Sequence, residues 1–137
     1  MRLSRTCLII FYNSNKKLLL QERWHYQKNW EDWAFFGGWV EQWESPLEAF
    51  FREAKEELDL DMANFDYKYL WEFKAEYPEM DFKVIRNLYL IKTDMKVEDF
   101  TVLEWIWARY FEFEEVKDLK FPSPQWPILD MIKPFIF

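Results

Sequence analysis

The sequence predicts an α/β fold in which helices cover a mixed β-sheet, and a single domain over residues 1–137. Its 137 residues are 50% hydrophobic, which is enough for one sizeable core, while the chain is too short for two ordinary domains. One segment carries a full set of helix-start signals. Turn-separated β-rich segments flank it, giving the order β-β-α-β-β-β-α-α that is typical of an α/β sandwich.

The first elements form a predicted hairpin. Arg5–Tyr12 is β-rich, residues 13–15 (Asn-Ser-Asn) are a turn, and Lys17–Arg23 resumes as a strand. The apolar run Cys7–Tyr12 is far shorter than a membrane span, so we expect a buried strand and no membrane partner.

A short apolar segment, Trp33–Phe36, leads into Gly37 and Gly38, the only two glycines of the chain. Glycine tolerates positive φ and lets the backbone approach a ligand closely. Their isolation therefore indicates a loop with a function.

The next segment predicts a helix over Pro46–Leu58. Ser45 is a suitable N-cap, proline follows at the first helical position, and Glu48 completes a capping box. Apolar residues recur at helical spacing and predict a core-facing stripe: Leu47, Phe50, Phe51, Ala54 and Leu58. Glu53, Glu56 and Glu57 fall roughly opposite that stripe.

The remaining chain predicts three strands and two helices. Two strands, Tyr67–Tyr77 and Phe82–Lys92, are joined by a turn at residues 78–81, and Glu104–Phe111 is a further strand. The predicted helices cover Phe113–Leu119 and Ile128–Lys133.

Composition limits the partners and the compartment. The net charge of −7 argues against a nucleic acid polymer, because binding a phosphate backbone relies on Lys and Arg. The single cysteine, Cys7, cannot form an internal disulfide and fits the core of a cytoplasmic protein. A small phosphorylated molecule remains a possible partner if metal cations bridge it to carboxylates.

The three helical glutamates need a counter-charge, because like charges at this spacing repel each other. Mg²⁺ prefers carboxylate and water oxygens and binds phosphates at the same time. For the triplet alone, a solvated acidic helix face is the favoured alternative. The residues around it reverse that preference.

Residues 38–60 resemble the Nudix box, Gly-x₅-Glu-x₇-Arg-Glu-U-x-Glu-Glu-x-Gly-U, where U is aliphatic. Its specified positions are matched, in order, by Gly38, Glu44, Arg52, Glu53, Ala54, Glu56, Glu57 and Leu60, and only the second glycine is replaced, by Asp59. So many fixed positions are far more specific than a lone glycine motif.

This resemblance implies a Nudix-type α/β/α sandwich with a mixed sheet, and a hydrolase that splits a diphosphate bond. Glu53, Glu56 and Glu57 would bind Mg²⁺ or Mn²⁺, and the loop of Gly37 and Gly38 would pass the phosphates. Arg52 and Glu44 would pair and orient the carboxylates, the alternative being an ordinary surface salt bridge.

The resemblance extends weakly to MutT-type nucleoside triphosphate hydrolases. Glu53 and Glu104 are both candidates for the base that activates water, although a solvated strand-end glutamate is an equal alternative for Glu104. Arg23 and Gln125 match positions that contact phosphate or nucleobase, and an amide can read a base edge. An edge-strand charge and an exposed or helix-capping glutamine are the alternatives for these two residues.

The chain departs from the family in its tryptophans. Trp39 and Trp43 stand where relatives commonly have glycine, and Trp105 and Trp107 repeat the pattern, in a chain with nine tryptophans and two glycines. One hypothesis is that the gene comes from a lineage that decodes UGA as glycine. The other is genuine aromatic packing or stacking on a base.

We therefore predict a Mg²⁺-dependent pyrophosphohydrolase acting on a nucleoside triphosphate or another nucleoside diphosphate derivative, with oxidised-nucleotide sanitation as one assignment. It would be a monomer or a homodimer. The alternatives are a non-catalytic nucleotide sensor with the same fold and a purely structural acidic domain.

Overall fold

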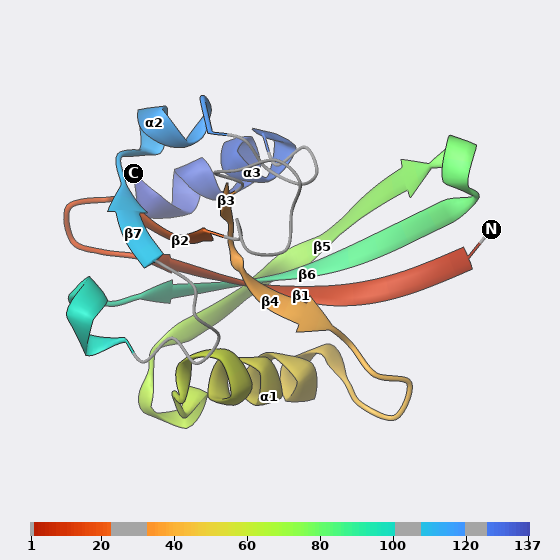
Figure 1. The fold of residues 1–137 in the computed structure, drawn as a ribbon, viewed down its shortest axis with the longest axis horizontal. Helices are drawn as coiled ribbons and strands as arrows, with labels where there is room; N and C mark the ends of the chain where they lie inside the picture. Colours follow the sequence, from red (N-terminus) through yellow and green to blue (C-terminus); the bar gives the residue numbers. More distant parts are fainter. Residues whose placement is uncertain (1, 23–32, 101–107, 120–125) are drawn as a thin grey trace.

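The computed structural model describes residues 2–22, 33–100, 108–119 and 126–137 and shows a seven-stranded mixed sheet with helices (Figure 1). The strands are β1 (Arg2–Tyr12), β2 (Leu18–Glu22), β3 (Trp33–Ala34), β4 (Phe36–Trp39), β5 (Tyr67–Tyr77), β6 (Phe82–Lys92) and β7 (Ala108–Phe111). The α-helices are α1 (Pro46–Leu58), α2 (Phe113–Val116) and α3 (Trp126–Ile136). Three short 3₁₀ helices are η2 (Met62–Asn64), η3 (Pro78–Met80) and η4 (Val97–Asp99).

The sheet is mixed because β1 and β6 run parallel, whereas the other pairs are antiparallel. Its order is β3-β2-β1-β6-β5, with β4 paired to β1 and β7 paired to β2. The parallel pairing extends from Arg2 opposite Phe82 to Tyr12 opposite Lys92. Eleven continuous residue pairs join β1 to β6 at the centre of the sheet. Strand β4 and helix α1 therefore pack on the best-paired strand of the sheet.

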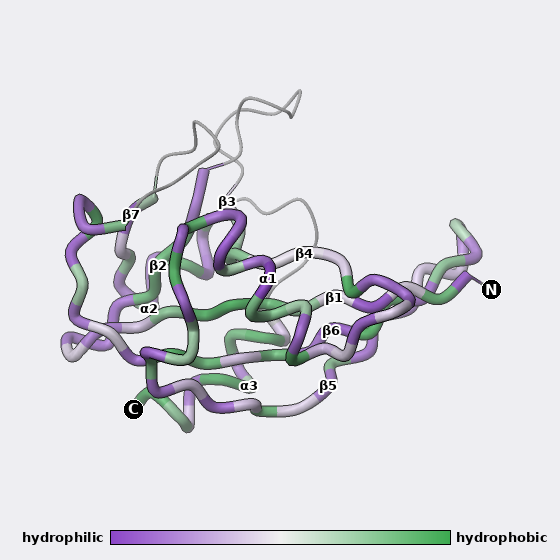
Figure 2. The backbone as a smooth tube through the Cα atoms, turned by 90° about the horizontal axis from the view of Figure 1, so that it is seen from below, coloured by the Kyte–Doolittle hydropathy of each residue, from purple (hydrophilic) through white to green (hydrophobic). Residues whose placement is uncertain are grey.

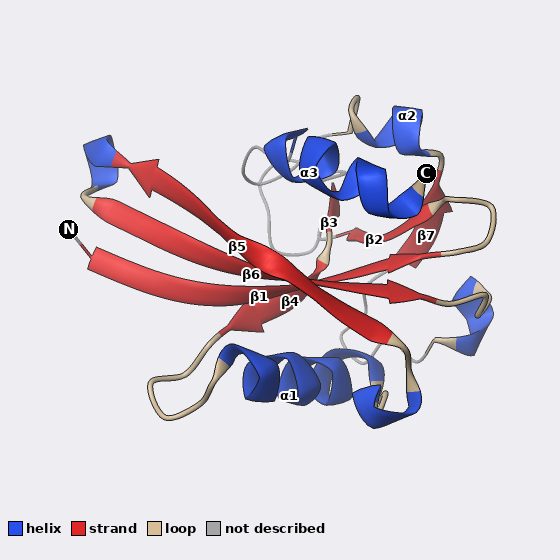
Figure 3. Ribbon diagram, turned by 180° about the vertical axis from the view of Figure 1, so that it is seen from behind, coloured by secondary structure: helices blue, strands red, loops and turns tan. Residues whose placement is uncertain are grey.

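Helices cover both faces of this sheet. Helix α1 lies on one face, and α2 and α3 lie on the other (Figures 1 and 3). Successive residues of β1 alternate between the two faces: Cys7, Ile9 and Phe11 belong to the core cluster under α1, and Ile10 belongs to the cluster under α3. Hydrophobic stretches therefore run through the middle of the molecule (Figure 2). The predicted α/β sandwich is confirmed.

Helix α1 begins and ends where its local signals place it. The Ser45 hydroxyl accepts from the Glu48 backbone N–H at 3.2 Å, and the Glu48 carboxylate accepts from the Ser45 N–H at 2.9 Å. At the other end Asp59 adopts φ 54°, the left-handed conformation that the family's glycine would take. Asp59 is thus compatible with this helix end, and Lys55 pairs with its carboxylate at 2.6 Å.

The buried face of α1 is shorter than predicted. Phe50, Ala54 and Leu58 are buried, as is Ala49, but Leu47 is 44% exposed. The buried row follows i, i+4 spacing from Phe50. Leu47 points in nearly the same direction around the helix, but it stands in the first turn, where it stays exposed. Its placement in the core stripe was wrong.

The other elements fall close to their predicted bounds. Strands β5 and β6 begin and end where predicted, helix α2 is shorter than expected, and α3 extends to Ile136. Only residues 108–111 of the predicted strand Glu104–Phe111 are described. Cys7 is buried in the core, as predicted. Within the described ranges, none of the helices combines the length and the apolar character that crossing a membrane requires.

Candidate active site

The two glycines bring strand β4 close to both β1 and helix α1. Gly37 has φ 141°, and a Cβ there would collide with the backbone carbonyl of Cys7 on β1. A Cβ on Gly38 would lie within 3.0 Å of the Glu53 carboxylate carbon and both of its oxygens. Glycine at 38 therefore leaves the space that the Glu53 carboxylate fills, and this carboxylate is held against the end of β4.

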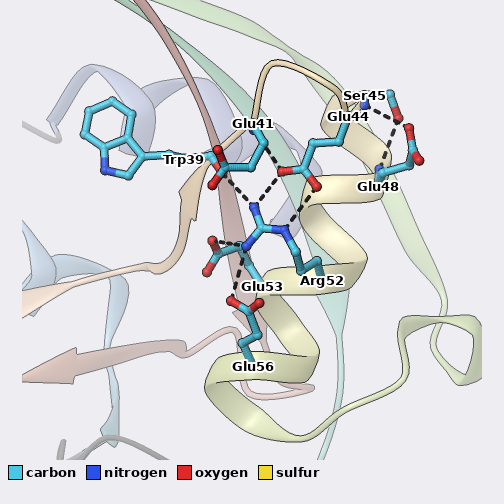
Figure 4. Close-up of polar contacts among 8 residues, drawn as sticks. All are labelled: Trp39, Glu41, Glu44, Ser45, Glu48, Arg52, Glu53 and Glu56. Carbon is cyan, nitrogen blue, oxygen red and sulfur yellow. Dashed lines mark hydrogen bonds and ion pairs between the residues drawn. The ribbon is translucent and has the colours of Figure 1, made fainter.

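Arg52 is the centre of a polar network between the loop after β4 and helix α1 (Figure 4). Its Nε and Nη2 donate to the two carboxylate oxygens of Glu44 at 3.0 and 2.5 Å, a bidentate pair. Nη2 also donates to the backbone carbonyl of Trp39 at 2.9 Å. The Glu44 side chain is only 1% exposed and also accepts from the Glu41 backbone N–H at 2.9 Å. The predicted pairing of Arg52 with Glu44 is present and partly buried.

The remaining nitrogen of Arg52 joins two glutamates of the acidic triplet. Nη1 donates to Glu53 Oε1 at 2.9 Å and to Glu56 Oε2 at 3.2 Å. The two carboxylates come from successive turns of α1 and converge on this guanidinium (Figure 4). The Glu53 side chain is 13% exposed and the Glu56 side chain is 59% exposed. Glu53 is therefore the inner and Glu56 the outer of the two carboxylates.

The charges of the network are fixed by these contacts. The Arg52 hydrogen bond lowers the pKa of Glu44 below its ordinary value of 4.5, and the Glu44 carboxylate is the main cause that raises the pKa of Arg52. Glu44 therefore stays ionised and Arg52 stays protonated. A buried guanidinium-carboxylate pair with this geometry is a rigid support for the neighbouring Glu53.

Cys7 reports on the position of two of the acids. The pKa of its thiol is raised to about 12, mainly by burial, with smaller contributions from the charges of Glu53 and Glu57. Both carboxylates are thus close enough to β1 to act on a side chain of that strand. The thiol stays protonated at neutral pH, which supports a core role rather than a nucleophilic one.

The residues present suit a hard divalent cation in their donor chemistry. Glu53 and Glu56 contribute carboxylate oxygens within 3.2 Å of one nitrogen, and glycine at 38 leaves room for the Glu53 carboxylate against β4. In the described part of the chain, however, no three acidic, cysteine or histidine side chains are grouped as a metal site. The Arg52 guanidinium instead bridges Glu53 and Glu56, so the exposed Glu56 side chain would have to turn for the two carboxylates to share a cation.

A pocket of about 200 Å³ adjoins the network. It lies between the start of β1 and the loop after β4, and its lining includes Arg5, Trp39 and Glu44. Three predicted site residues, Arg23, Glu104 and Gln125, lie outside the described residues. Two contacts of the network were not predicted, the Trp39 carbonyl and the Glu41 N–H, because backbone groups leave no signal in a sequence.

The chain resembles known proteins in its domain and its fold. The model of the NUDIX domain matches residues 2–132. No curated protein sequence matches significantly. Among solved structures, MutT from a study of Aliivibrio salmonicida and Vibrio cholerae has a TM-score of 0.73 at 18% identity, covering 98% of this chain and 99% of that one.

Two further structures have the same fold. The NUDIX domain of Shewanella oneidensis NrtR, complexed with ADP ribose, has a TM-score of 0.76 at 10% identity, covering 100% of this chain and 90% of that chain. The Ap4A hydrolase of C. elegans has a TM-score of 0.70 at 16% identity, covering 99% and 100%. At these identities the likeness establishes the fold.

Proposed function

The chain belongs to the NUDIX domain family and is a hydrolase of phosphoric anhydride bonds, and from this premise we propose that it is a Mg²⁺- or Mn²⁺-dependent pyrophosphohydrolase of nucleotides. The substrate class is a nucleoside triphosphate or another nucleoside diphosphate derivative. MutT, an Ap4A hydrolase and a domain bound to ADP ribose are among the structures with this fold, which supports a nucleotide substrate. Removal of oxidised nucleotides is one assignment within this class.

The observation that carries the proposal is the convergence of Glu53 and Glu56 on Arg52 along one edge of α1, with Glu53 held against Gly38 of β4. Like-charged carboxylates gathered this closely are stable only with a positive partner. Arg52 supplies one, and its hydrogen bonds hold both groups at 3.2 Å or less from a single nitrogen. On a solvated acidic helix face the carboxylates would point into water, whereas the Glu53 carboxylate lies against Gly38 of β4.

In the proposed mechanism each residue has a distinct task. Glu53, Glu56 and Glu57 would hold the metal, which would supply charge neutralisation for the diphosphate and activation of the attacking water. Glu53 or Glu104 accepts the proton of that water at a carboxylate oxygen. Arg52 is a positioning residue because it donates to Glu53 and to the Trp39 carbonyl, and Glu44 in turn holds Arg52. Gly37 and Gly38, which lie in strand β4 and not in the predicted loop, would keep the end of this strand free of side chains where phosphates pass.

Hydrolysis of a nucleotide panel, with product identification and with or without MgCl₂ and MnCl₂, tests the function. We expect metal-dependent turnover of at least one nucleotide, and loss of activity by about 100-fold or more in Glu53→Gln and Glu56→Gln. Glu114→Gln is the matched control, because Glu114 is 75% exposed on α2 and distant in sequence from the network. Equal turnover in all four proteins, or in EDTA, would contradict the metal role of the acids.

A second candidate is a sensor that binds nucleotide without cleaving it. It is favoured by two exposed tryptophans. Trp39 is the last residue of β4 and is 56% exposed, and Trp43 follows in the segment before α1 and is 74% exposed. Their indoles would hold a nucleotide in an unproductive pose. Nucleotide binding by calorimetry without any hydrolysis in the panel would select this candidate over the enzyme.

A further inference from the structure

Strand β5 forms one edge of the sheet. It is the last strand in the order, and among the described residues it pairs with β6 alone. Its first half lies near the helices: Tyr67 contacts α1 through Phe50, and Trp71 contacts Phe135 of α3. A register shift between Tyr69 and Glu72 separates this half from the second.

The second half of β5 projects away from the helices, together with η3 and the start of β6 (Figures 1 and 3). From Phe73 to Tyr77 it pairs regularly with β6, without a bulge, opposite Arg86 to Phe82. Its outer side therefore presents backbone N–H and C=O groups that have no strand partner in the chain's described sheet. An edge of this kind is a template for another strand.

The sequence of this edge is self-complementary. If two copies pair antiparallel with Ala75 opposite Ala75, then Phe73 faces Tyr77 and Lys74 faces Glu76, each twice because of the two-fold symmetry. Aromatic pairs and opposite charges are the cross-strand pairs that stabilise a sheet. The small Ala75 at the axis places no bulk between the two strands.

The aromatic pairs and the charged pairs lie on opposite faces of the strand. Phe73, Ala75 and Tyr77 are half-buried and share a face with Phe82 and Val84, where the rings of Tyr77 and Phe82 stack at 6.2 Å. Lys74 and Glu76 are exposed on the other face. Glu76 has a weak contact within its own chain, 3.8 Å from Lys83, with its side chain 57% exposed. It is therefore available to a second cation.

We propose that this edge, Phe73–Tyr77 of β5, pairs with the same edge of a second copy of the chain, joining two sheets across a two-fold axis at Ala75. The proposal does not depend on the catalytic function. A five-residue strand pair is a small interface, so the dimer forms in a concentration-dependent way. Lys74, which would protect an edge from unwanted pairing, is matched here by Glu76 of the other copy.

Charge variants test the pairing and its register. Sedimentation equilibrium over a concentration series should show a dimer for the unaltered protein, and a dissociation constant raised by about tenfold or more in Lys74→Glu and in Glu76→Lys. Lys74→Glu combined with Glu76→Lys restores opposite charges across the axis and keeps the net charge at −7, so dimerisation should return. Lys92→Glu, an exposed charge change on β6, is the control and should leave the dimer intact.

A crosslink gives an independent readout if a charge variant fails to fold. Opposite residues of antiparallel strands lie about 4.5–5.5 Å apart at Cα, within disulfide reach. Ala75→Cys should therefore yield a disulfide-linked dimer under mild oxidation, and the fully buried Cys7 does not compete. Lys92→Cys should stay monomeric on a denaturing gel. A monomer at all concentrations, a failed rescue by the double variant, or crosslinking at Phe73→Cys in place of Ala75→Cys would overturn the proposal.

Discussion

Because Gly38 has no side chain, the Glu53 carboxylate can lie against the backbone of β4. The Cβ of any other residue would occupy the space that this carboxylate fills. Because the carboxylate is the end of a flexible side chain, it can move aside while the fold survives.

We expect the melting temperature of Gly38→Ala to lie within a few degrees of that of the unaltered protein. Its metal-dependent turnover should fall by about tenfold or more, because the Glu53 carboxylate is displaced. Enzyme assays and circular dichroism melting measure both. Gly37→Ala is the contrasting variant: its Cβ meets the Cys7 backbone and its φ of 141° strains any side chain, so it should lower the melting temperature as well. Equal effects of the two variants on stability would contradict this assignment.

The exposed tryptophans are a second feature at the scale of the residue. Trp39 and Trp43 contribute little to the core, whereas Trp33 packs edge-on against Phe111 at 4.7 Å and Trp71 packs on Phe135 at 5.4 Å. Packing therefore accounts for Trp33 and Trp71 and leaves Trp39 and Trp43 without a structural role in the fold.

If UGA is decoded as glycine in the source organism, the protein from that organism carries glycine at positions 39 and 43. Peptide mass spectrometry of the natural protein, or the codons themselves, measures this directly. UGG codons at Trp39, Trp43, Trp105 and Trp107 would exclude it. Since these side chains at 39 and 43 are mostly exposed, Trp39→Gly with Trp43→Gly should fold normally in either case.

At the scale of the element, the contact between Glu44 and Arg52 ties the loop after β4 to helix α1. Glu44 is almost fully buried, and its pKa in the folded protein is below 4.5. The folded state therefore binds fewer protons than the unfolded state near this pH. The stabilisation is complete above pH 4.5 and is lost as the pH falls through the lowered pKa.

We expect Glu44→Gln to destabilise the fold by about 2 kcal/mol at pH 7, because the Arg52 charge loses a buried partner. This corresponds to a fall in melting temperature of roughly 6 to 8 °C. Melting curves from pH 7 to pH 3 should show the difference between the two proteins shrinking below pH 4.5. A difference that stays constant over this range would show that the ion pair is not responsible.

The capping box at the start of α1 provides another measurable contribution. Ser45→Ala removes the hydroxyl that accepts from Glu48 N–H, and the expected cost is about 1 kcal/mol. Urea unfolding measures it, and Ser45→Asp, which can accept the same bond, should recover most of the stability. A loss of stability in the aspartate variant equal to that of alanine would rule out capping as the cause.

At the scale of the whole molecule, metal binding should be linked to folding. A ligand that binds only the native state at a concentration 100 times its Kd stabilises the protein by about 2.7 kcal/mol, which raises the melting temperature by several degrees. Differential scanning fluorimetry with MgCl₂ and a nonhydrolysable nucleotide should show this rise for the unaltered protein. Glu53→Gln should show little or none, while Glu114→Gln should behave like the parent. A rise that persists in Glu53→Gln would place the metal elsewhere.

The sequence by itself determined the family motif and the bounds of several elements. The start of α1 at Ser45 and its left-handed end at Asp59 follow from interactions within a few residues, and local signals of this kind can be recognised in any sequence. The bounds of β5 and β6 were predicted in the same way. The order of acids and arginine over residues 38–60 identified the family motif without any coordinates.

Only the tertiary structure decided how distant parts meet. The parallel pairing of β1 with β6 puts residues about eighty positions apart side by side, and no local signal predicts it. The same holds for the Trp39 carbonyl on Arg52, for the Glu53 carboxylate against Gly38, and for the exposure of Leu47, which spacing alone had placed in the core. Such contacts depend on which surfaces pack together, and packing is a property of the whole chain, whereas helix caps and turns depend on neighbouring residues.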